Sequence, residues 1–195
     1  MSKYGDWTRG EDEALINKLG GLEVARGILR GELLVEVKPK LPPPLLRKVA
    51  SVAVNGAKKF VARDVLKEAN VGWTGDNFKK LFLGNVEEDV ADITFAINRL
   101  EQSSSDAPIM AQLGDRTEIK LTHFFELLKK QSKGEDGALL TNGNANIAYI
   151  RGSDGNLWAV HGGWGSACGY WGVEVYSVEG PSRWSDGFQI LSRDS

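Results

Sequence analysis

The chain has 195 residues, of which 42% are hydrophobic and 26% are charged, and its formal net charge is −2. This length predicts one domain, or a compact domain with a small appendage. The composition excludes a disordered chain, the lack of a run of about 18 apolar residues excludes a membrane span, and the charge argues against a strong nucleic-acid binder. A single cysteine, Cys168, rules out an internal disulfide, and the N-terminus has no apolar signal core, so we expect a cytoplasmic protein.

Residues 1–37 are expected to form a helical hairpin followed by a short strand. Thr8 and Glu11 have the spacing of a capping box at the start of the first helix, and the pair Gly20-Gly21 supplies its end. A second helix is expected over residues 22–29, because apolar residues recur there at helical spacing. A DNA-binding helix–turn–helix is disfavoured, since two glycines are shorter than the usual turn of about three or four residues.

A proline-rich segment, residues 38–44, marks the predicted domain boundary. It follows the apolar run of residues 33–37, which predicts a strand. Stacked prolines restrict φ and donate no hydrogen bonds, so the segment must be extended. The sequence therefore predicts an N-terminal unit, a linker and a main domain over residues 45–195.

The central region is predicted to mix strands with short helices. Strand-forming residues precede the pair Asn55-Gly56, which favours a turn. The expected elements are strands at residues 48–54, 90–100 and 108–113, a turn at 72–77, a short helical turn at 77–83, and either a strand or a short helix at 60–68. The order of these strands in a sheet does not follow from the sequence.

The C-terminal part carries the clearest helix and a set of strands. Residues 121–131 are apolar on one face and end in lysines, and Thr122 is expected to cap this helix. Its buried face is expected to contain Phe124, Phe125, Leu127 and Leu128. Strands are expected at residues 146–151, 157–162, 170–179 and 188–193, with a hairpin turn at 152–156. The sequence thus predicts an α+β fold with a short helical N-terminal appendage, a mixed central region, and a C-terminal antiparallel β-meander over 146–193 packed on one helix.

Three stretches of the chain, at residues 75–84, 134–143 and 183–193, resemble a family of bacterial hypothetical proteins. They read Gly-Asp-Asn-Phe-Lys-Lys-Leu-Phe-Leu-Gly, Gly-Glu-Asp-Gly-Ala-Leu-Leu-Thr-Asn-Gly and Arg-Trp-Ser-Asp-Gly-Phe-Gln-Ile-Leu-Ser-Arg. Members of that family are similar in their N-terminal helices and tryptophan-rich tail, and the similarity would cover most of the chain. The resemblance implies no activity and no site residue.

Aromatic residues are concentrated in the last quarter of the chain. Four of the six tryptophans lie there, at Trp158, Trp164, Trp171 and Trp184. Alternation along residues 170–178 separates two faces of a strand. The two sets are Trp171, Val173 and Val175 on one face, and Tyr170, Glu174 and Tyr176 on the other. Either the second face is exposed and binds a partner protein, a base or a sugar, or both faces are covered and the aromatics are core. The candidate binding residues are Tyr170, Trp171, Tyr176, Trp164 and Trp184.

Cys168 and His161 are the only pair that resembles a nucleophile with its base. They flank a glycine-rich turn, and an imidazolium beside a thiol stabilises the reactive thiolate. Two residues in one hairpin support a catalytic dyad weakly, so an enzyme is the least favoured hypothesis. We find no metal-ligand spacing and no cofactor fingerprint, and His123 is expected at a helix surface or boundary.

Basic residues are concentrated between residues 25 and 70, where ten Lys and Arg stand against four Asp and Glu. The candidate phosphate contacts are Arg26, Arg30, Lys38, Lys40, Arg47, Lys48, Lys58 and Lys59. They are spread over helix, proline segment and strand, so no single patch is implied. The leading hypothesis is a non-enzymatic cytoplasmic protein that binds a partner protein or small ligand through the aromatic sheet, the N-terminal helices or both. A nucleic-acid-associated protein is the alternative.

Overall fold

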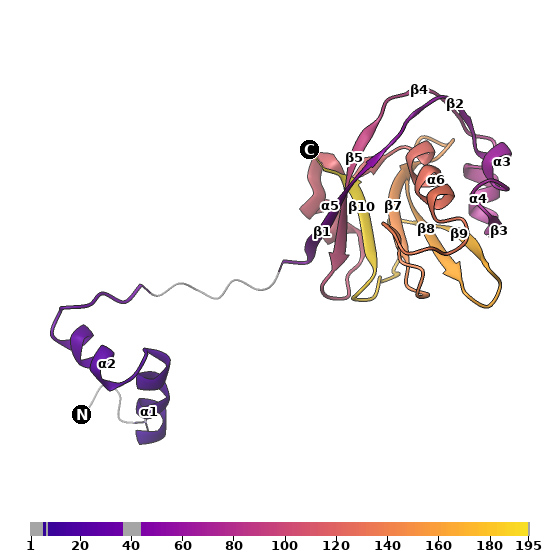
Figure 1. Cartoon of the computed structure of the whole chain (residues 1–195). Coiled ribbons are helices and arrows are strands. Elements are labelled where there is room, and N and C mark those ends of the chain that lie inside the picture. Colours follow the sequence, from indigo (N-terminus) through magenta and orange to yellow (C-terminus); the bar gives the residue numbers. More distant parts are fainter. Residues whose placement is uncertain (1–5, 7, 37–43, 195) are drawn as a thin grey trace. The chain divides into compact units, whose positions relative to one another are not determined.

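The computed structural model describes residues 6, 8–36 and 44–194 of the chain (Figure 1). The chain forms two compact units, Met1–Pro42 and Pro43–Ser195, which we call the N-terminal unit and the body. The division falls within the proline-rich segment 38–44. Residues 37–43 themselves, including Lys38 and Lys40, lie outside the described residues.

The N-terminal unit contains two helices, α1 (Arg9–Lys18) and α2 (Leu22–Leu29), as the sequence predicts. The capping box is confirmed. The Glu11 amide donates to the Thr8 hydroxyl at 3.3 Å, and the Thr8 amide donates to the Glu11 carboxylate at 2.9 Å. Gly20, with φ of 100°, ends α1 in a backbone conformation that favours glycine.

The segment after α2 does not form the predicted strand. Residues 33–36 have no regular secondary structure, and Val37 lies outside the described residues. Leu33 instead turns back onto α2, where its amide donates to the carbonyl oxygen of Gly27 at 3.2 Å. The apolar run is not enough for a strand, because a strand needs a neighbour to satisfy its backbone hydrogen bonds.

The body is built on one large sheet (Figure 1). A cluster of buried apolar side chains packs on each face of this sheet. Its strands, in spatial order, are β1 (Leu46–Val54), β5 (Ile93–Leu100), β10 (Gln189–Arg193), β7 (Asn146–Arg151), β8 (Leu157–Gly165), β9 (Tyr170–Ser177) and β3 (Val71–Thr74). A short strand, β6 (Glu118–Ile119), adds to β7 in parallel. Most of the pairs are antiparallel, and helices and strands are mixed, so the predicted α+β class is confirmed.

The C-terminal strands occupy the predicted positions, but the last one leaves the meander. β7, β8 and β9 pair antiparallel one after another. β10 lies between β5 and β7 and is parallel to β7. Ile190 and Leu191 are consecutive, point to opposite faces and are both fully buried, which favours a position with neighbours on both sides over one at the sheet edge.

The helices of the body are α3 (Ala62–Val65), α4 (Asp76–Leu81), α5 (Asp106–Leu113), the 3-10 turn η1 (Gly114–Arg116) and α6 (Leu121–Lys130). The strand predicted at 108–113 is wrong, because this segment belongs to α5. Pro108 lies in the first turn, where a missing N–H breaks no helical hydrogen bond. Ile109 and Leu113, four residues apart, are both buried, so the apolar spacing is helical after all.

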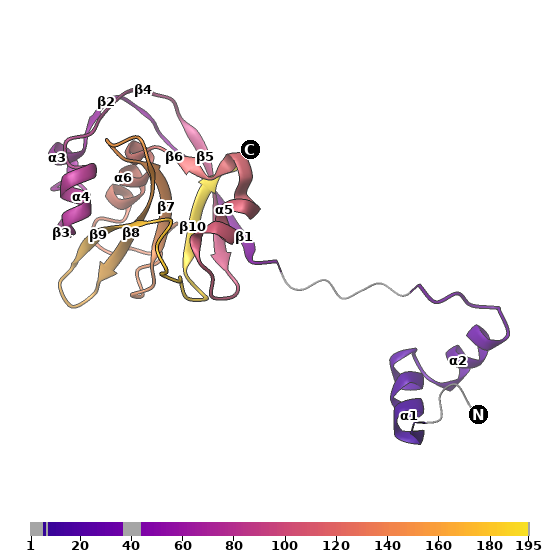
Figure 2. The ribbon, with the colours of Figure 1, turned by 180° about the vertical axis from the view of Figure 1, so that it is seen from behind.

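A two-stranded ribbon pairs β2 (Ala57–Val61) with β4 (Val86–Val90). Figure 2 shows it arching from β1 and β5 towards α3 and α4. The turn predicted at Asn55-Gly56 is wrong, because the chain continues from β1 into β2 while β4 continues into β5. A Cβ at Gly56 would lie 1.8 Å from the carbonyl oxygen of Val90, so this glycine permits a close approach of two strands.

Two other central segments differ from their predictions. Segment 60–68 contains both predicted alternatives, since β2 is followed directly by α3. The turn predicted at 72–77 is wrong, because the edge strand β3 and the start of α4 fill that segment. The helical turn predicted at 77–83 is confirmed by α4.

Helix α6 packs on one face of the sheet and buries all four predicted apolar residues, Phe124, Phe125, Leu127 and Leu128. Its predicted cap, Thr122, is wrong. The carboxylate of Glu87, on β4, accepts hydrogen bonds from the amides of Leu121 and Thr122 at 3.2 and 2.9 Å. The helix therefore begins where a residue far away in the sequence satisfies its first N–H groups.

Candidate ligand-binding sites

The outer face of β3, β9 and β8 carries the half-buried aromatic side chains. The set predicted to face inwards is buried in the cluster beneath α6: Trp171, Val173 and Val175. The set predicted to face outwards is half-buried: Tyr170, Glu174 and Tyr176. The alternation in β9 is thus confirmed, and the outer face is neither fully covered nor fully open.

Three glycines leave part of this outer face without side chains. Gly163 of β8 lies directly opposite Gly172 of β9, and Gly165 is the next residue of β8 on the same face. We call Gly163, Gly165 and Gly172 the glycine strip. On one side lies Trp73 of β3, because a Cβ added at Gly172 would be 3.5 Å from its Cε3 atom. On the other side lies His161, because a Cβ added at Gly163 would be 3.2 Å from its Nε2 atom.

His161 combines burial with an unsatisfied ring nitrogen. Its ring packs against Tyr176 and Trp184, with centroids 6.4 and 6.2 Å away. Burial lowers the pKa of His161, while the charge of Glu174, its partner across the strands, opposes that shift. Nδ1 is buried without a hydrogen-bond partner among the described residues. The ring is therefore held neutral at pH 7, with Nε2 beside the glycine strip.

A cavity of about 340 Å³ opens beside Trp73. Trp73 is 49% exposed, which is unusual for so large an apolar side chain. The polar groups of the lining come from Asp76, Asn77, Lys79 and Glu174. Lys79 pairs with Asp76 at 3.2 Å, whereas the Glu174 carboxylate accepts a hydrogen bond from the Tyr176 hydroxyl at 3.1 Å. The site combines an open aromatic ring with a carboxylate, which is the mixture of apolar and polar groups found in small-molecule sites.

The predicted tryptophans are structural rather than exposed. Trp164 packs edge-on against Trp171 at 5.3 Å, and both are buried. Trp184 is 6% exposed and donates to Asp106 at 2.7 Å. Sequence reasoning missed Trp73, because it lies about 100 residues before the strand it adjoins and its own segment was assigned to a turn.

A buried carboxylate anchors the opposite cluster. Asp106, at the start of α5, accepts from the Tyr149 hydroxyl at 2.8 Å and from the Trp184 indole at 2.7 Å, both on the same oxygen. Asp106 is 1% exposed, and burial raises its pKa against the effect of these two hydrogen bonds. The group thus joins α5, β7 and the loop before β10 through buried hydrogen bonds.

Cys168 and His161 lie apart in the hairpin. The register pairs His161 with Glu174 and Gly165 with Tyr170, which puts about 13 Å of strand between His161 and the turn. Cys168 is exposed in that turn. Its contact is with Tyr170, whose pKa is raised by a hydrogen bond with the thiol. The hairpin does not bring the imidazole to the sulfur.

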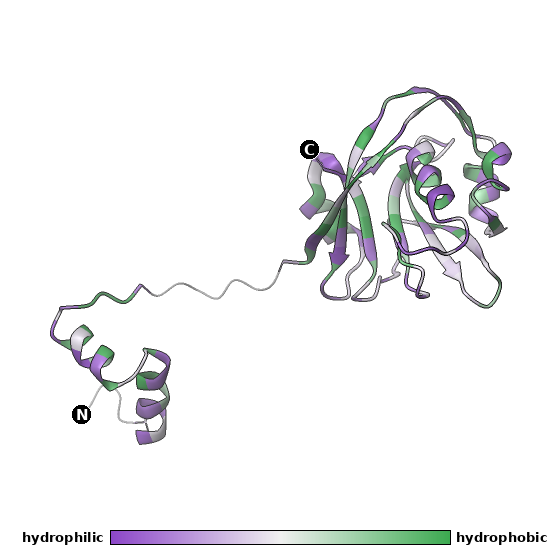
Figure 3. Cartoon of the chain, viewed as in Figure 1, coloured by the Kyte–Doolittle hydropathy of each residue, from purple (hydrophilic) through white to green (hydrophobic). Residues whose placement is uncertain are grey.

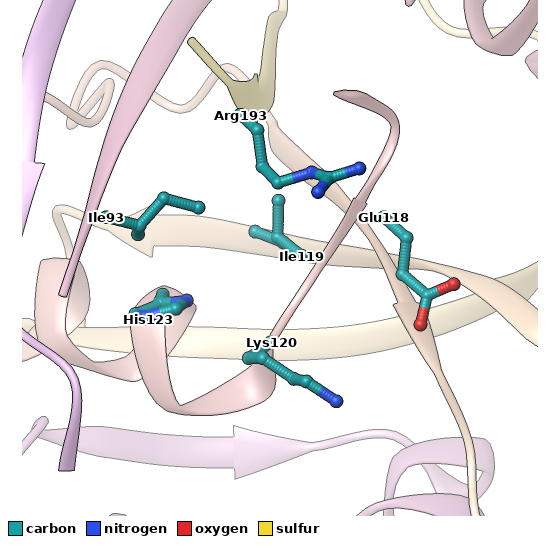
Figure 4. A pocket seen from close by; sticks show the side chains of 6 residues that line it. All are labelled: Ile93, Glu118, Ile119, Lys120, His123 and Arg193. Carbon is teal, nitrogen blue, oxygen red and sulfur yellow. The ribbon is translucent and has the colours of Figure 1, made fainter. Parts of the chain in front are cut away.

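A second cavity, of about 330 Å³, lies between the ends of β5 and β10 and the start of α6 (Figure 4). Its lining consists of Ile93, Glu118, Ile119, Lys120, His123 and Arg193. The expectation that His123 lies at a helix surface or boundary is wrong, since it is only 4% exposed. Its Nε2 lies 2.8 Å from the carbonyl oxygen of Ala91, and its ring packs edge-on against Phe95 at 5.7 Å.

The candidate phosphate-contacting residues are largely paired with carboxylates. The observed pairs are Arg26 with Glu23, Arg30 with Glu32, Arg47 with Glu101 and Lys48 with Asp194. Lys58 and Lys59 lie on β2, and Lys59 is opposite Glu88 of β4. Paired cations release fewer counterions on binding a polyanion, and these residues come from both units.

Apolar side chains stand exposed on the N-terminal unit. Figure 3 shows the apolar segment that follows α2. The exposed leucines and valine are Leu15, Leu22, Leu29, Leu33, Leu34 and Val35. α1 has no buried residue, and the only buried residue of α2 is Gly27.

Comparisons with protein-family models, curated proteins and solved structures found no match to this chain. The resemblance to bacterial hypothetical proteins stays a prediction. Within residues 6, 8–36 and 44–194, no helix is long and apolar enough to cross a membrane, and no group of three or more His, Cys, Asp or Glu side chains is placed to hold a metal ion. The sites above are thus the basis for any functional conclusion.

Proposed function

We propose that the protein binds a neutral saccharide on the outer face of β3, β9 and β8. The observation that carries the proposal is the half-exposed Trp73 ring beside the glycine strip, with Glu174 next to it. A pyranose has one apolar face, which stacks on an indole, and hydroxyls around its rim, which donate to carboxylates. The glycine strip lets the ring approach the backbone, because no side chain stands in the way.

The local charge favours a neutral ligand over a nucleotide. Asp76 is paired with Lys79, so Glu174 leaves the cavity with an excess of negative charge. A phosphate group would be repelled there. His161, neutral because of its burial, offers Nε2 for a hydroxyl rather than a cation for an anion.

Binding to a panel of immobilised neutral glycans, followed by titration of tryptophan fluorescence, tests the proposal. Trp73→Ala should lower affinity by about 5- to 150-fold, since stacking on one aromatic ring is worth about 1–3 kcal/mol, and it should leave the unfolding transition nearly unchanged. Trp158→Ala is the matched control, because Trp158 is half-buried at the other end of β8. Wild-type protein that binds no neutral glycan at millimolar concentration would remove the proposal.

Gly172→Ala gives an independent test of the glycine strip. A Cβ there meets Trp73 at 3.5 Å, an ordinary contact, so the fold should tolerate it. The added methyl should occupy space that the sugar ring needs to approach the backbone, and it should therefore weaken saccharide binding. If Gly172→Ala binds as the wild type does, the ligand does not rest on the strip.

A second candidate function is self-association through the N-terminal unit. A unit of 42 residues rarely buries enough apolar surface to be stable by itself, and Leu29 and Leu34 are 87% and 98% exposed. The occupant we infer is a second copy of this unit. In and just after α2, Glu23 pairs with Arg26 and Arg30 pairs with Glu32, so these four charges are balanced and do not repel an identical surface.

Light scattering across a range of protein concentrations tests this second candidate. The wild type should show a concentration-dependent dimer, and Leu29→Ser with Leu34→Ser should be monomeric. Val86→Ser, at a similarly exposed residue on β4 of the body, is the control and should leave the dimer intact. A wild type that stays monomeric throughout would refute self-association.

The other two hypotheses receive less support. Nucleic-acid association has to rely on Arg26, Arg30, Arg47 and Lys48, which are already paired. Catalysis has to rely on Cys168 and His161, which the hairpin keeps apart. A cytoplasmic location stays part of the proposal and is supported by the exposed Cys168, which needs a reducing environment to remain a free thiol.

A further inference from the structure

The cavity at the start of α6 is separate from the saccharide site, and its chemistry is different (Figure 4). Its walls come from β5, β6, β10 and α6. Two of its side chains, His123 and Arg193, have a buried nitrogen without a hydrogen-bond partner among the described residues. Buried polar groups are normally satisfied, whereas these two nitrogens are unpaired and covered by neighbouring atoms, so a ligand in the cavity can satisfy them only if the covering side chains shift.

The open nitrogen of His123 acts as an acceptor. Its Nε2 lies 2.8 Å from the Ala91 carbonyl oxygen. A carbonyl oxygen only accepts, so Nε2 must carry the proton. In the neutral ring Nδ1 then presents a lone pair, and it is Nδ1 that has no partner. The group that satisfies it must bring an O–H or N–H donor.

Arg193 presents the opposite requirement. Its guanidinium donates through one amino group to the carbonyl oxygen of Asp115, but the Nε–H is buried and unpaired. Guanidinium donors favour carboxylate oxygens, with which they form charge-assisted hydrogen bonds. The one acidic residue among the lining residues, Glu118, is already paired with Arg151. The cavity therefore has an excess of positive charge from Arg193 and Lys120.

The two polar ends are joined by apolar surface. Figure 4 shows Arg193 and His123 on opposite sides of the cavity, with the side chains of Ile93 and Ile119 in the region between them. A ligand that reaches both nitrogens must carry an anion at one end and a donor at the other. Its middle must be apolar, because isoleucine side chains offer no hydrogen bond.

We propose that this cavity is a binding site for a small organic carboxylate with an apolar middle and a hydroxyl at the far end. The carboxylate accepts from the Arg193 Nε–H, and the hydroxyl donates to His123 Nδ1. Ile93 and Ile119 contact the carbon skeleton. The inference does not depend on the saccharide site, because it rests on other residues.

Calorimetric titration with two probe acids tests the site. 4-Hydroxybenzoate has both polar ends, and benzoate lacks the hydroxyl. We expect saturable binding of 4-hydroxybenzoate and about tenfold weaker binding of benzoate, which corresponds to one lost hydrogen bond and an unsatisfied acceptor. Equal binding of both acids, or no saturable binding of 4-hydroxybenzoate, would overturn the proposal.

Variants separate the two ends of the site. His123→Gln retains an amide N–H for the Ala91 carbonyl but has no lone pair at the place of Nδ1, so it should abolish the preference for 4-hydroxybenzoate over benzoate. Arg193→Lys keeps the positive charge but lacks the Nε–H, so it should weaken the binding of both acids. Lys80→Gln, at an exposed residue of α4, is the control and should change the affinity for neither acid.

A second measurement on the wild-type protein does not depend on the folding of His123→Gln. The His123 ring is examined directly by ¹⁵N NMR. 4-Hydroxybenzoate should then shift the His123 Nδ1 resonance, and benzoate should not. An Nδ1 resonance indifferent to both acids would contradict the site.

Discussion

The N-terminal unit and the body are stabilised in opposite ways. In the N-terminal unit each helix is closed by local hydrogen bonds: Gly21 donates to Ile16 and Glu32 donates to Gly27, both at 2.9 Å. These are the bonds of a Schellman motif, which short sequence signals encode. Yet Gly27 is the only residue buried in either helix. In the body, strands far apart in the sequence pair and bury two clusters.

The difference shows that helix formation and stability are separate properties of this chain. Caps and glycine stops determine where α1 and α2 begin and end, but they supply little free energy of unfolding. The body gains its stability from burial. Changes in the body should therefore alter global unfolding, whereas changes to the helix caps of the N-terminal unit should alter its helix content without moving that unfolding transition.

The largest effect is expected at Asp106. Asp106→Ala leaves the buried donors of Tyr149 and Trp184 without an acceptor and should lower the free energy of unfolding by about 3 kcal/mol. Asp106→Asn keeps an acceptor oxygen and removes a buried charge, so it should be neutral or stabilising. Urea unfolding at pH 7 measures both. If the two variants lose equal stability, the carboxylate charge itself is needed.

A smaller effect is expected at the start of α6. Glu87→Ala removes the acceptor for the amides of Leu121 and Thr122 and should cost about 1–2 kcal/mol. Glu88→Ala, the neighbouring exposed residue on β4, is the control. A loss at Glu87 that matches the control would mean that long-range capping contributes little, and the contrast between the two units would weaken.

The next effect is a pH dependence from His161. Burial lowers its pKa below the unfolded value of 6.5, so the unfolded chain binds more protons just below that pH. The contribution of His161 to the free energy of unfolding should be fully present above about pH 6.5 and should be lost as the pH decreases towards the folded pKa. His161→Phe should remove this decline between pH 6.5 and 5. An unchanged slope in the variant would show that other groups cause it.

The smallest global effect is expected at Thr8. Thr8→Ala removes the capping box and should reduce the helical circular-dichroism signal slightly, without moving the cooperative unfolding transition of the body. Truncation of residues 1–42 should likewise leave a cooperative transition. A truncated chain that unfolds without a transition would contradict the separation into two units.

The sequence by itself determined the features that depend on neighbouring residues. The capping box at Thr8, the glycine stops, the apolar face of α6 and the alternation in β9 follow from spacing over a few residues. The hairpin turn after Arg151 belongs with them, since Gly152 donates to Asn156 at 2.9 Å as the turn residues predict. Each of these features involves residues that are close together in the chain, so the residues that form it can be read from a short stretch of sequence.

Only the tertiary structure decided the rest. The insertion of β10 beside β5, the capping of α6 by Glu87 and the burial of His123 all depend on residues distant in the sequence. The candidate saccharide site is of the same kind, because Trp73 and Gly172 become neighbours only when β3 pairs with β9. A sequence pattern predicts which face of an element is apolar, but which element covers that face depends on how the whole chain packs.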